Sequence, residues 1–192
     1  MDNLREGWAV GDVSPLSTNG VFFTRDGGKT WSGAGGQLPA GVAAADFVSS
    51  AEAVCADGRG RVVRMENRLV QATPAAAFGL RSVRDLKLTQ NDQGWLVGDG
   101  GLVQRTTDAG RSWHPSGQDL AQGPSAQCDW RAVAAREGPQ GTKLWIVGAP
   151  GSVVLCSADD GATWELLPTG QPLPLNDVAF LDDQHGIAVG AL

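Results

Sequence analysis

An eight-residue phrase occurs three times in this chain of 192 residues, and it restricts the fold more than any other feature. The phrase reads Ser/Thr-x-Asp-x-Gly-x-Ser/Thr-Trp, and the copies are TRDGGKTW at 24–31, TTDAGRSW at 106–113 and SADDGATW at 157–164. Even one copy is expected by chance only on the order of once in a thousand chains of this composition. Three copies therefore indicate a fold made of repeated structural units.

Short apolar segments rich in strand-forming residues surround each copy. A Trp-containing segment that ends in Gly stands upstream at 8–11, 95–98 and 145–148, and a second apolar segment leads into the phrase. A further apolar run precedes the Trp segment, as at 84–90 and 130–135. We expect each unit to be four antiparallel strands, A to D in chain order, with the phrase at the turn between C and D. Such units of roughly 40–50 residues are typical of a β-propeller, an all-β fold.

The pattern divides the chain into a single propeller segment of about four blades. The second unit is degenerate, with Leu69 where the repeated phrase has its Trp. The expected blades cover approximately residues 7–38, 42–72, 82–117 and 129–168, and residues 173–192 begin a further blade.

The residue types of the phrase suit a tight turn. The Asp carboxylate accepts backbone N–H groups within the turn, Gly supplies a positive φ, and Trp covers the turn and buries apolar area against its blade. The alternative is that one of the Asp residues is catalytic. The expected structural residues are Thr24, Asp26, Gly28, Trp31, Thr106, Asp108, Gly110, Trp113, Ser157, Asp159, Gly161 and Trp164.

The repeated phrase resembles the Asp-box, or bacterial neuraminidase repeat, and is called the box below. The longer pattern is GW-x-VG, a Gly-led strand and T-x-DGG-x-TW. It is similar to the repeats of the photosystem II stability and assembly factor family and its non-photosynthetic bacterial relatives. This resemblance implies a seven-bladed propeller that helps membrane complexes to assemble, without established catalytic residues. About four blades are fewer than such a ring holds, so we expect a partial ring of a larger propeller.

Alternating strand directions give the propeller two distinct faces. The B–C and D–A connections lie on one face, the loop face, whereas the A–B turns and the boxes lie on the other, the box face. The longer connections, at 12–20, 71–81 and 114–129, fall mostly on the loop face. Long loops on a rigid scaffold often carry binding sites, although tolerated insertions are the open alternative.

Charge is distributed unevenly along the chain. The net charge of −6 disfavours a general nucleic-acid binder, but residues 58–87 carry +5, which leaves −11 for the rest. Within this basic segment, Arg59, Arg81 and Arg84 are expected to meet on the loop face and to dock an acidic segment of a partner protein. The alternative is an ordinary solvated surface.

Three acids follow a strand B: Asp12, Asp57 and Asp99. They are expected to take the same register, and one interpretation is a ring of acids that forms a polar site near the propeller axis. They are more simply explained as residues that brace the B–C turns.

Catalysis is not predicted, and the main alternative is a glycosidase or a carbohydrate-binding propeller. Asp-box propellers occur in sialidases, whose mechanism needs a Tyr nucleophile, and the chain has no Tyr. Other Asp-box glycosidases use two carboxylates from different blades, which a sequence cannot place. Three Cys and two His match no metal-ligand spacing, so neither a cofactor nor a metal is expected.

The predicted function is therefore a non-catalytic scaffold for protein–protein interaction and complex assembly, of the photosystem II assembly factor type. The implied partner is a subunit of a membrane complex, and direct insertion into the membrane is not expected. The start of the chain, MDNLREGWAV, lacks the apolar stretch of a signal peptide. Resemblance alone implies that the parent protein is exported to a periplasmic, lumenal or extracellular compartment.

Overall fold

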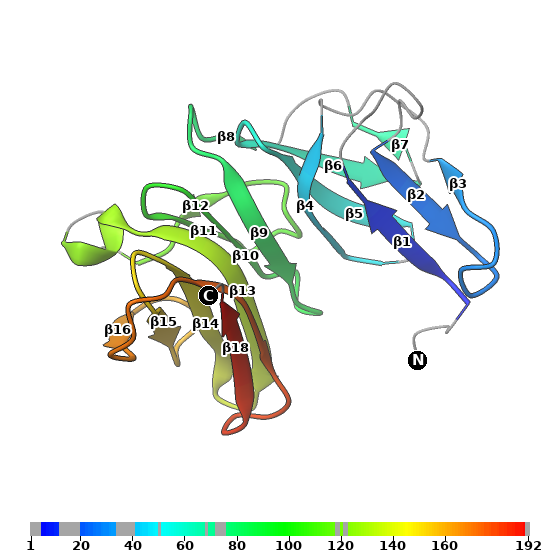
Figure 1. Cartoon of the computed structure of the whole chain (residues 1–192). Coiled ribbons are helices and arrows are strands. Elements are labelled where there is room, and N and C mark those ends of the chain that lie inside the picture. The colour runs from blue at the N-terminus through cyan, green and yellow to red at the C-terminus, as the bar shows by residue number, and fades with distance from the viewer. Residues whose placement is uncertain are drawn as a thin grey trace.

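The computed structural model describes residues 5–11, 20–33, 41–49, 51–67, 69–71, 76–117, 120 and 123–190. These residues form five antiparallel sheets, which follow one another in chain order along an arc (Figure 1). The two complete four-stranded sheets with a box, blades 3 and 4, keep the strand order A to D. The predicted all-β propeller fold of four-stranded antiparallel sheets is confirmed.

The strands are short, as expected for a propeller blade. Blade 1 contains β1 (Gly7–Val10), β2 (Val21–Thr24) and β3 (Ser32–Gly33). Blade 2 contains β4 (Val42–Phe47), β5 (Glu52–Asp57), β6 (Arg61–Glu66) and β7 (Leu69–Val70), and β8 (Ala76–Ala77) also pairs with β6. Blade 3 contains β9 (Val83–Leu88), β10 (Gly94–Gly98), β11 (Leu102–Thr106) and β12 (His114–Pro115). Blade 4 contains β13 (Asp129–Gly138), β14 (Gly141–Ala149), β15 (Val153–Ser157) and β16 (Glu165–Pro168), and the fifth sheet contains β17 (Leu175–Phe180) and β18 (Gly186–Gly190).

The apolar core lies between neighbouring sheets. One cluster joins blades 2 and 3, a second joins blades 3 and 4 around the fully buried Trp95 and Trp130, and smaller clusters join the outer pairs. A strand-B Trp also contacts strand A of the next sheet at both ends of the arc. The ring centroids of Trp8 and Phe47 lie 5.1 Å apart, and those of Trp145 and Phe180 lie 3.7 Å apart. Burial on both faces explains why several strands are apolar throughout instead of alternating.

The pairing of strands A and B corrects one expectation about the acids after strand B. In blade 2, Asp57 is the last residue of β5 and pairs with Val42. In blade 3, the equivalent pair is Gly98 with Val83, and Asp99 comes after the strand. Asp57 and Asp99 therefore do not share a register, because Asp57 is a strand residue whereas Asp99 belongs to a turn. Asp12 lies outside the described residues.

Candidate functional site

Each box forms a turn whose Asp is held by its own neighbours. In blade 3, the Asp108 carboxylate accepts hydrogen bonds from the Ser112 N–H at 2.8 Å, the Ser112 hydroxyl at 2.6 Å and the Thr106 hydroxyl at 2.7 Å. The Gly110 N–H donates to the Thr106 hydroxyl oxygen at 2.9 Å. The same bonds recur around Asp26 and Asp159. All three carboxylates are thus directed into their own turns.

These hydrogen bonds keep the box carboxylates ionised. The Thr30 hydroxyl and N–H, with the Thr24 hydroxyl, lower the pKa of Asp26 from 3.8 to about 2. The Thr163 hydroxyl is the main group that lowers the pKa of Asp159. Burial raises the pKa of Asp108, but its hydrogen bonds outweigh that effect and hold the value below the usual one. A carboxylate with a lowered pKa is a poor general acid and a weak base at neutral pH.

The boxes of blades 3 and 4 also contact the preceding blade. A Cβ added at Gly110 would stand 2.5 Å from the Val54 side chain, and one added at Gly161 would stand 2.7 Å from Trp95 Nε1. Both glycines have a positive φ, so the absence of a side chain serves the turn and the close approach together. The box is therefore a turn and an inter-blade contact at once.

The box tryptophans differ in burial, which corrects the expectation that each buries a large apolar area against its own blade. Trp113 is 8% exposed and packs with Val54 of the preceding blade, whereas Trp31 is 46% exposed. Within the described residues, no blade precedes β1–β3 in the arc, so Trp31 has no such neighbour. Its Nε1–H still donates to the Gly28 carbonyl at 3.1 Å.

On the loop face, the structure brings Arg59 and Arg81 together. A Cβ added at Gly60, next to Arg59, would stand 2.2 Å from the Arg81 carbonyl oxygen, and the Phe78 N–H donates to the Gly60 carbonyl at 3.0 Å. Both arginines are exposed, and no ion pair of either side chain is found in the part of the chain that the structure describes. The D–A connection of blade 2 is thus held against the B–C turn of the same blade. Arg81 in the connection and Arg59 in the turn are the two cations without an ion pair among the described residues.

Arg84 lies on the same face but has a partner. Its guanidinium donates to both carboxylate oxygens of Asp99, at 2.8 and 3.0 Å. This hydrogen bonding raises the pKa of Arg84 and lowers the pKa of Asp99. The pair offsets the Arg84 charge, so the basic patch predicted from three arginines contains two uncompensated cations.

The acid that braces the neighbouring turn is Asp57. Its carboxylate accepts hydrogen bonds from the N–H groups of Arg59 and Arg61, at 2.9 and 2.8 Å, and from Arg61 Nε at 2.7 Å. The Asp57 side chain is fully buried. It therefore positions the turn that carries Arg59 and is inaccessible to a ligand.

The longer loops are partly built into the scaffold. Residues 76–77 of the segment 71–81 form β8, which pairs with β6. In the segment 114–129, Leu120 and Cys128 are buried between blades 3 and 4, and the Gly101 N–H donates to the Cys128 carbonyl at 2.7 Å. The segment 12–19 lies outside the described residues. Two of the three predicted binding loops thus also cover or extend blades.

Sequence reasoning missed two carboxylates that join strands A of adjacent blades. Asp85 accepts hydrogen bonds from the N–H groups of Leu86 and of Val133 in blade 4, at 2.8 and 2.9 Å. In the same way, Asp46 accepts one from the Leu88 N–H in blade 3 at 2.8 Å. Donor and acceptor are 42 and 48 residues apart, and no local motif marks such a contact.

The remaining reactive groups give no sign of a metal or redox site. Among the residues that can be placed, no group of three His, Cys, Asp or Glu side chains is close enough to hold a metal ion. The three cysteines are free, and burial raises the pKa of Cys55 to about 12 and that of Cys156 to about 11. The described ranges also contain no helix with the length and hydrophobicity needed to cross a bilayer.

Comparisons with known proteins identify related sequences. The profile of the family described as Photosynthesis system II assembly factor YCF48 matches residues 76–177, and that of the BNR/Asp-box repeat matches residues 22–32. The photosystem II assembly lipoprotein Ycf48 of Picosynechococcus sp. is 27% identical over an alignment of 182 residues, and the match covers 88% of this chain and 50% of that protein. The chain spans half or less of the length of the curated relatives that it matches.

Solved structures share the fold at low sequence identity. The structure described as YCF48 bound to D1 peptide matches with a TM-score of 0.68 and 18% identity, covering 99% of this chain and 59% of that one. An ancestral GH74 enzyme matches with a TM-score of 0.61 and 14% identity, covering 93% of this chain and 28% of that one. The fold is thus shared by assembly factors and by GH74 enzymes.

Proposed function

Because the chain belongs to the photosystem II assembly factor YCF48 family, we propose that it is a non-catalytic scaffold that binds a segment of a photosystem II protein during assembly. The structure described as YCF48 bound to D1 peptide supports a peptide as the form of the partner. The observation that carries the proposal to this chain is that the exposed Arg59 and Arg81 lie on neighbouring segments of one face, positioned by Asp57, and form no ion pair with another described residue.

The chemistry of the two arginines favours an acidic partner segment. Guanidinium groups bind carboxylates through two parallel hydrogen bonds, and unpaired cations are available for this without first breaking an internal ion pair. The chain as a whole is acidic, at −6, so attraction is local and directs such a segment to this patch. Arg84 supports the surface through Asp99 and is not itself a primary contact.

Glycoside hydrolysis is less well supported, although GH74 enzymes share the fold. It needs a pair of carboxyl groups facing a substrate, one of them a proton donor. The box carboxylates are engaged within their turns and have lowered pKa values. The pKa of Asp85 is raised to about 6, but both of its oxygens accept backbone N–H groups, which suits a structural link between blades.

The relatives support an exported compartment for the parent protein. The Picosynechococcus protein is described as a lipoprotein, which supports an exported location on the lumenal or periplasmic side of a membrane for the parent protein of this chain. In that setting the propeller meets membrane-protein segments from the aqueous side.

Peptide binding tests the proposed function. Fluorescein-labelled peptides that tile the D1 protein of the source organism are titrated with the full chain, and binding is followed by anisotropy. We expect at least one acidic peptide to bind, and Arg59→Glu/Arg81→Glu to weaken it about tenfold or more. Lys29→Glu, which reverses an exposed cation on the box face, is the matched control and should bind like the unmodified chain. Equal binding by both variants would refute the loop-face site.

A further inference from the structure

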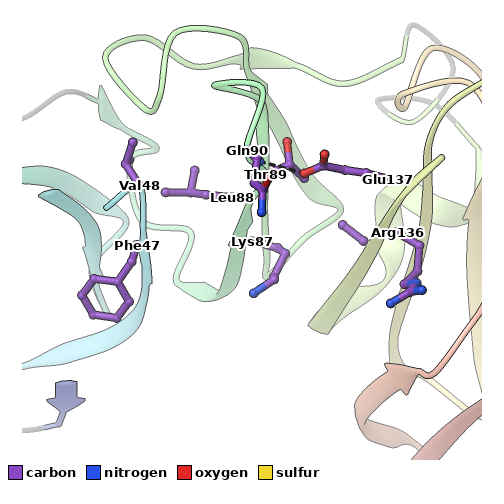
Figure 2. Close-up of a pocket in the computed structure, with 9 residues that line it drawn as sticks. Phe47, Val48, Lys87, Leu88, Thr89, Gln90, Arg136 and Glu137 are labelled. Carbon is purple, nitrogen blue, oxygen red and sulfur yellow. Dashed lines mark hydrogen bonds between the residues drawn. The ribbon is translucent and has the colours of Figure 1, made fainter. Parts of the chain in front are cut away.

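A groove of about 400 Å³ opens on the box face, where the first strands of three blades end (Figure 2). It is lined by residues 47–48 at the end of β4, residues 87–90 at and after the end of β9, and residues 135–137 within β13. Because strands A run from the loop face to the box face, this groove and the Arg59/Arg81 patch lie at opposite ends of the blades. The two sites are therefore independent.

Two cations border the groove. Lys87 forms an ion pair with Asp46 at 3.0 Å, which leaves two of its three N–H donors for a ligand. Arg136 is exposed, and no hydrogen bond or ion pair of its side chain is found within the described ranges. In Figure 2, both side chains extend toward the lower side of the view, with Lys87 on β9 and Arg136 on β13.

Besides Asp46, Glu137 and Asp182 are acids near these cations, and both are engaged elsewhere. Glu137 accepts hydrogen bonds from the Gln90 N–H at 2.7 Å and from Asn91 Nδ2 at 3.5 Å, so it joins the rim of blade 4 to the β9–β10 turn (Figure 2). Asp182 is near enough for Arg136 to lower its pKa, but its stronger interactions are with the Gln184 N–H and with His185. A carboxylate from outside would thus meet cation donors that are still unsatisfied.

The floor of the groove is apolar at one end, around Leu88, although polar atoms make up most of the lining. Leu88 is buried there, and the half-buried Phe47 and Val48 lie on one side of it, as Figure 2 shows. An extended peptide places successive side chains on opposite sides. An acidic side chain can therefore contact the cationic rim while its apolar neighbour contacts the floor of the same groove. The combination of cationic rim and apolar floor matches such a ligand more closely than a free inorganic anion, which would use the rim alone.

We propose that this groove is a second docking site, which binds an acidic peptide segment through an Asp or Glu side chain held by Lys87 and Arg136, with a neighbouring apolar side chain over Leu88. The volume accommodates a few residues of a peptide, so the site recognises a short motif. Together with the Arg59/Arg81 patch, it gives the propeller one peptide site on each face, which allows two segments to be held at the same time.

The experiment uses the full chain and a defined probe. A fluorescein-labelled peptide of alternating Leu and Glu, amidated at its C-terminus, is titrated by anisotropy against a matched Leu–Gln peptide. We expect the Glu peptide to bind about tenfold more tightly, and Arg136→Gln to remove most of that difference. The Arg136 side chain makes no hydrogen bond or ion pair with another described residue, so this variant should keep the melting temperature of the unmodified chain. Lys87→Gln serves as a second variant that also breaks the Asp46 pair.

Further arms separate this site from its alternatives. Arg59→Glu/Arg81→Glu should leave the Arg136-dependent part of Glu-peptide binding unchanged within twofold, because those residues lie on the other face. Equal affinity for the Glu and Gln peptides, or a loss of binding confined to Arg59→Glu/Arg81→Glu, would overturn the proposal. A Leu–Gln peptide with a free C-terminus that binds more tightly than the amidated Glu peptide would also overturn it, in favour of a site for chain termini.

Discussion

Gly161 of the blade 4 box faces the Trp95 indole of blade 3, and a methyl group at residue 161 would stand 2.7 Å from Trp95 Nε1. Gly110 has the same relationship to Val54 one blade earlier. In blades 3 and 4 the box thus fastens the blade to the one before it, in addition to reversing the chain. This double role explains why the box glycine and tryptophan recur with the turn-forming Asp in one phrase.

The box glycines provide a matched pair for this inter-blade contact. Gly28 and Gly161 have similar φ values, +85° and +77°, but a Cβ at Gly28 would meet nothing closer than Trp31 at 3.8 Å. Gly28→Ala should therefore cost about 1–2 kcal/mol of unfolding free energy from backbone strain alone. Gly161→Ala should cost about 1–3 kcal/mol more, because Trp95 and Ser116 must move. Denaturant unfolding measures both, and equal costs would contradict the inter-blade contact.

The two tryptophans Trp31 and Trp113 should contribute unequally to stability. Trp113 is almost completely buried between blades 2 and 3, so Trp113→Ala should cost about 3–5 kcal/mol. Trp31→Ala removes a half-exposed ring and one hydrogen bond, so about 1 kcal/mol is expected. Thermal unfolding by circular dichroism distinguishes them, and a Trp31→Ala variant as unstable as Trp113→Ala would show that Trp31 is buried in solution.

The turn-bracing Asp should matter more than an exposed Asp. Asp108→Ala leaves the Ser112 N–H and two hydroxyl groups without their acceptor and should lower the unfolding free energy by about 1–3 kcal/mol. Asp183→Ala is the control, because Asp183 makes a single surface ion pair with Lys143 and should change stability by less than about 1 kcal/mol. Similar midpoints in urea for the two variants would argue against the brace.

The pH dependence of the unfolding free energy should reveal the raised pKa of the buried Asp85. Burial raises its pKa from 3.8 to about 6, so its contribution to stability is present in full below pH 3.8 and is lost as the pH rises through 6. Neighbouring Asp177 adds to the shift, whereas Lys87 and the two backbone N–H groups oppose it. We expect the unfolding free energy of Asp85→Asn, measured from pH 4 to 7.5, to fall less with pH than that of the unmodified chain. Parallel profiles for the two proteins would exclude the Asp85 contribution.

At lower pH the box carboxylates should dominate the pH dependence of the unfolding free energy. Their folded pKa values lie below 3.8, at about 2 for Asp26, so their contribution is present above pH 3.8 and is lost as the pH falls toward 2. The chain should therefore unfold in acid, and Asp108→Ala should unfold with a weaker dependence on pH in that range.

Local chemistry made the fold predictable. The box spacing and the apolar segments around it report strand and turn positions directly, because each depends on residues within about ten positions. The exposure of Trp31 was not predictable in this way, since it depends on whether another blade lies beside blade 1. The same holds for the Asp85 link to Val133, whose donor is 48 residues away.

The candidate sites were predictable only in part. The basic composition of residues 58–87 pointed to Arg59, Arg81 and Arg84, but the sequence did not show that Asp99 pairs with Arg84. The groove near Lys87 and Arg136 has no sequence signal, because three strands from three blades must come together to form it. The Arg84–Asp99 pair depends on how two strands of blade 3 lie side by side, and the groove depends on how three blades meet. Local sequence patterns encode neither arrangement.

We propose a division of roles in which the boxes build the scaffold and exposed arginines on the opposite face bind the partner. Its most direct test measures the unfolding free energy and the affinity for the acidic D1-derived peptide in the same two variants, at a temperature where both are folded. We expect Asp108→Ala to lower the unfolding free energy without changing the affinity for the peptide. Arg59→Glu/Arg81→Glu should lower the affinity without changing the unfolding free energy. Loss of affinity in Asp108→Ala at unchanged stability would contradict this division of roles and would make the box a binding site.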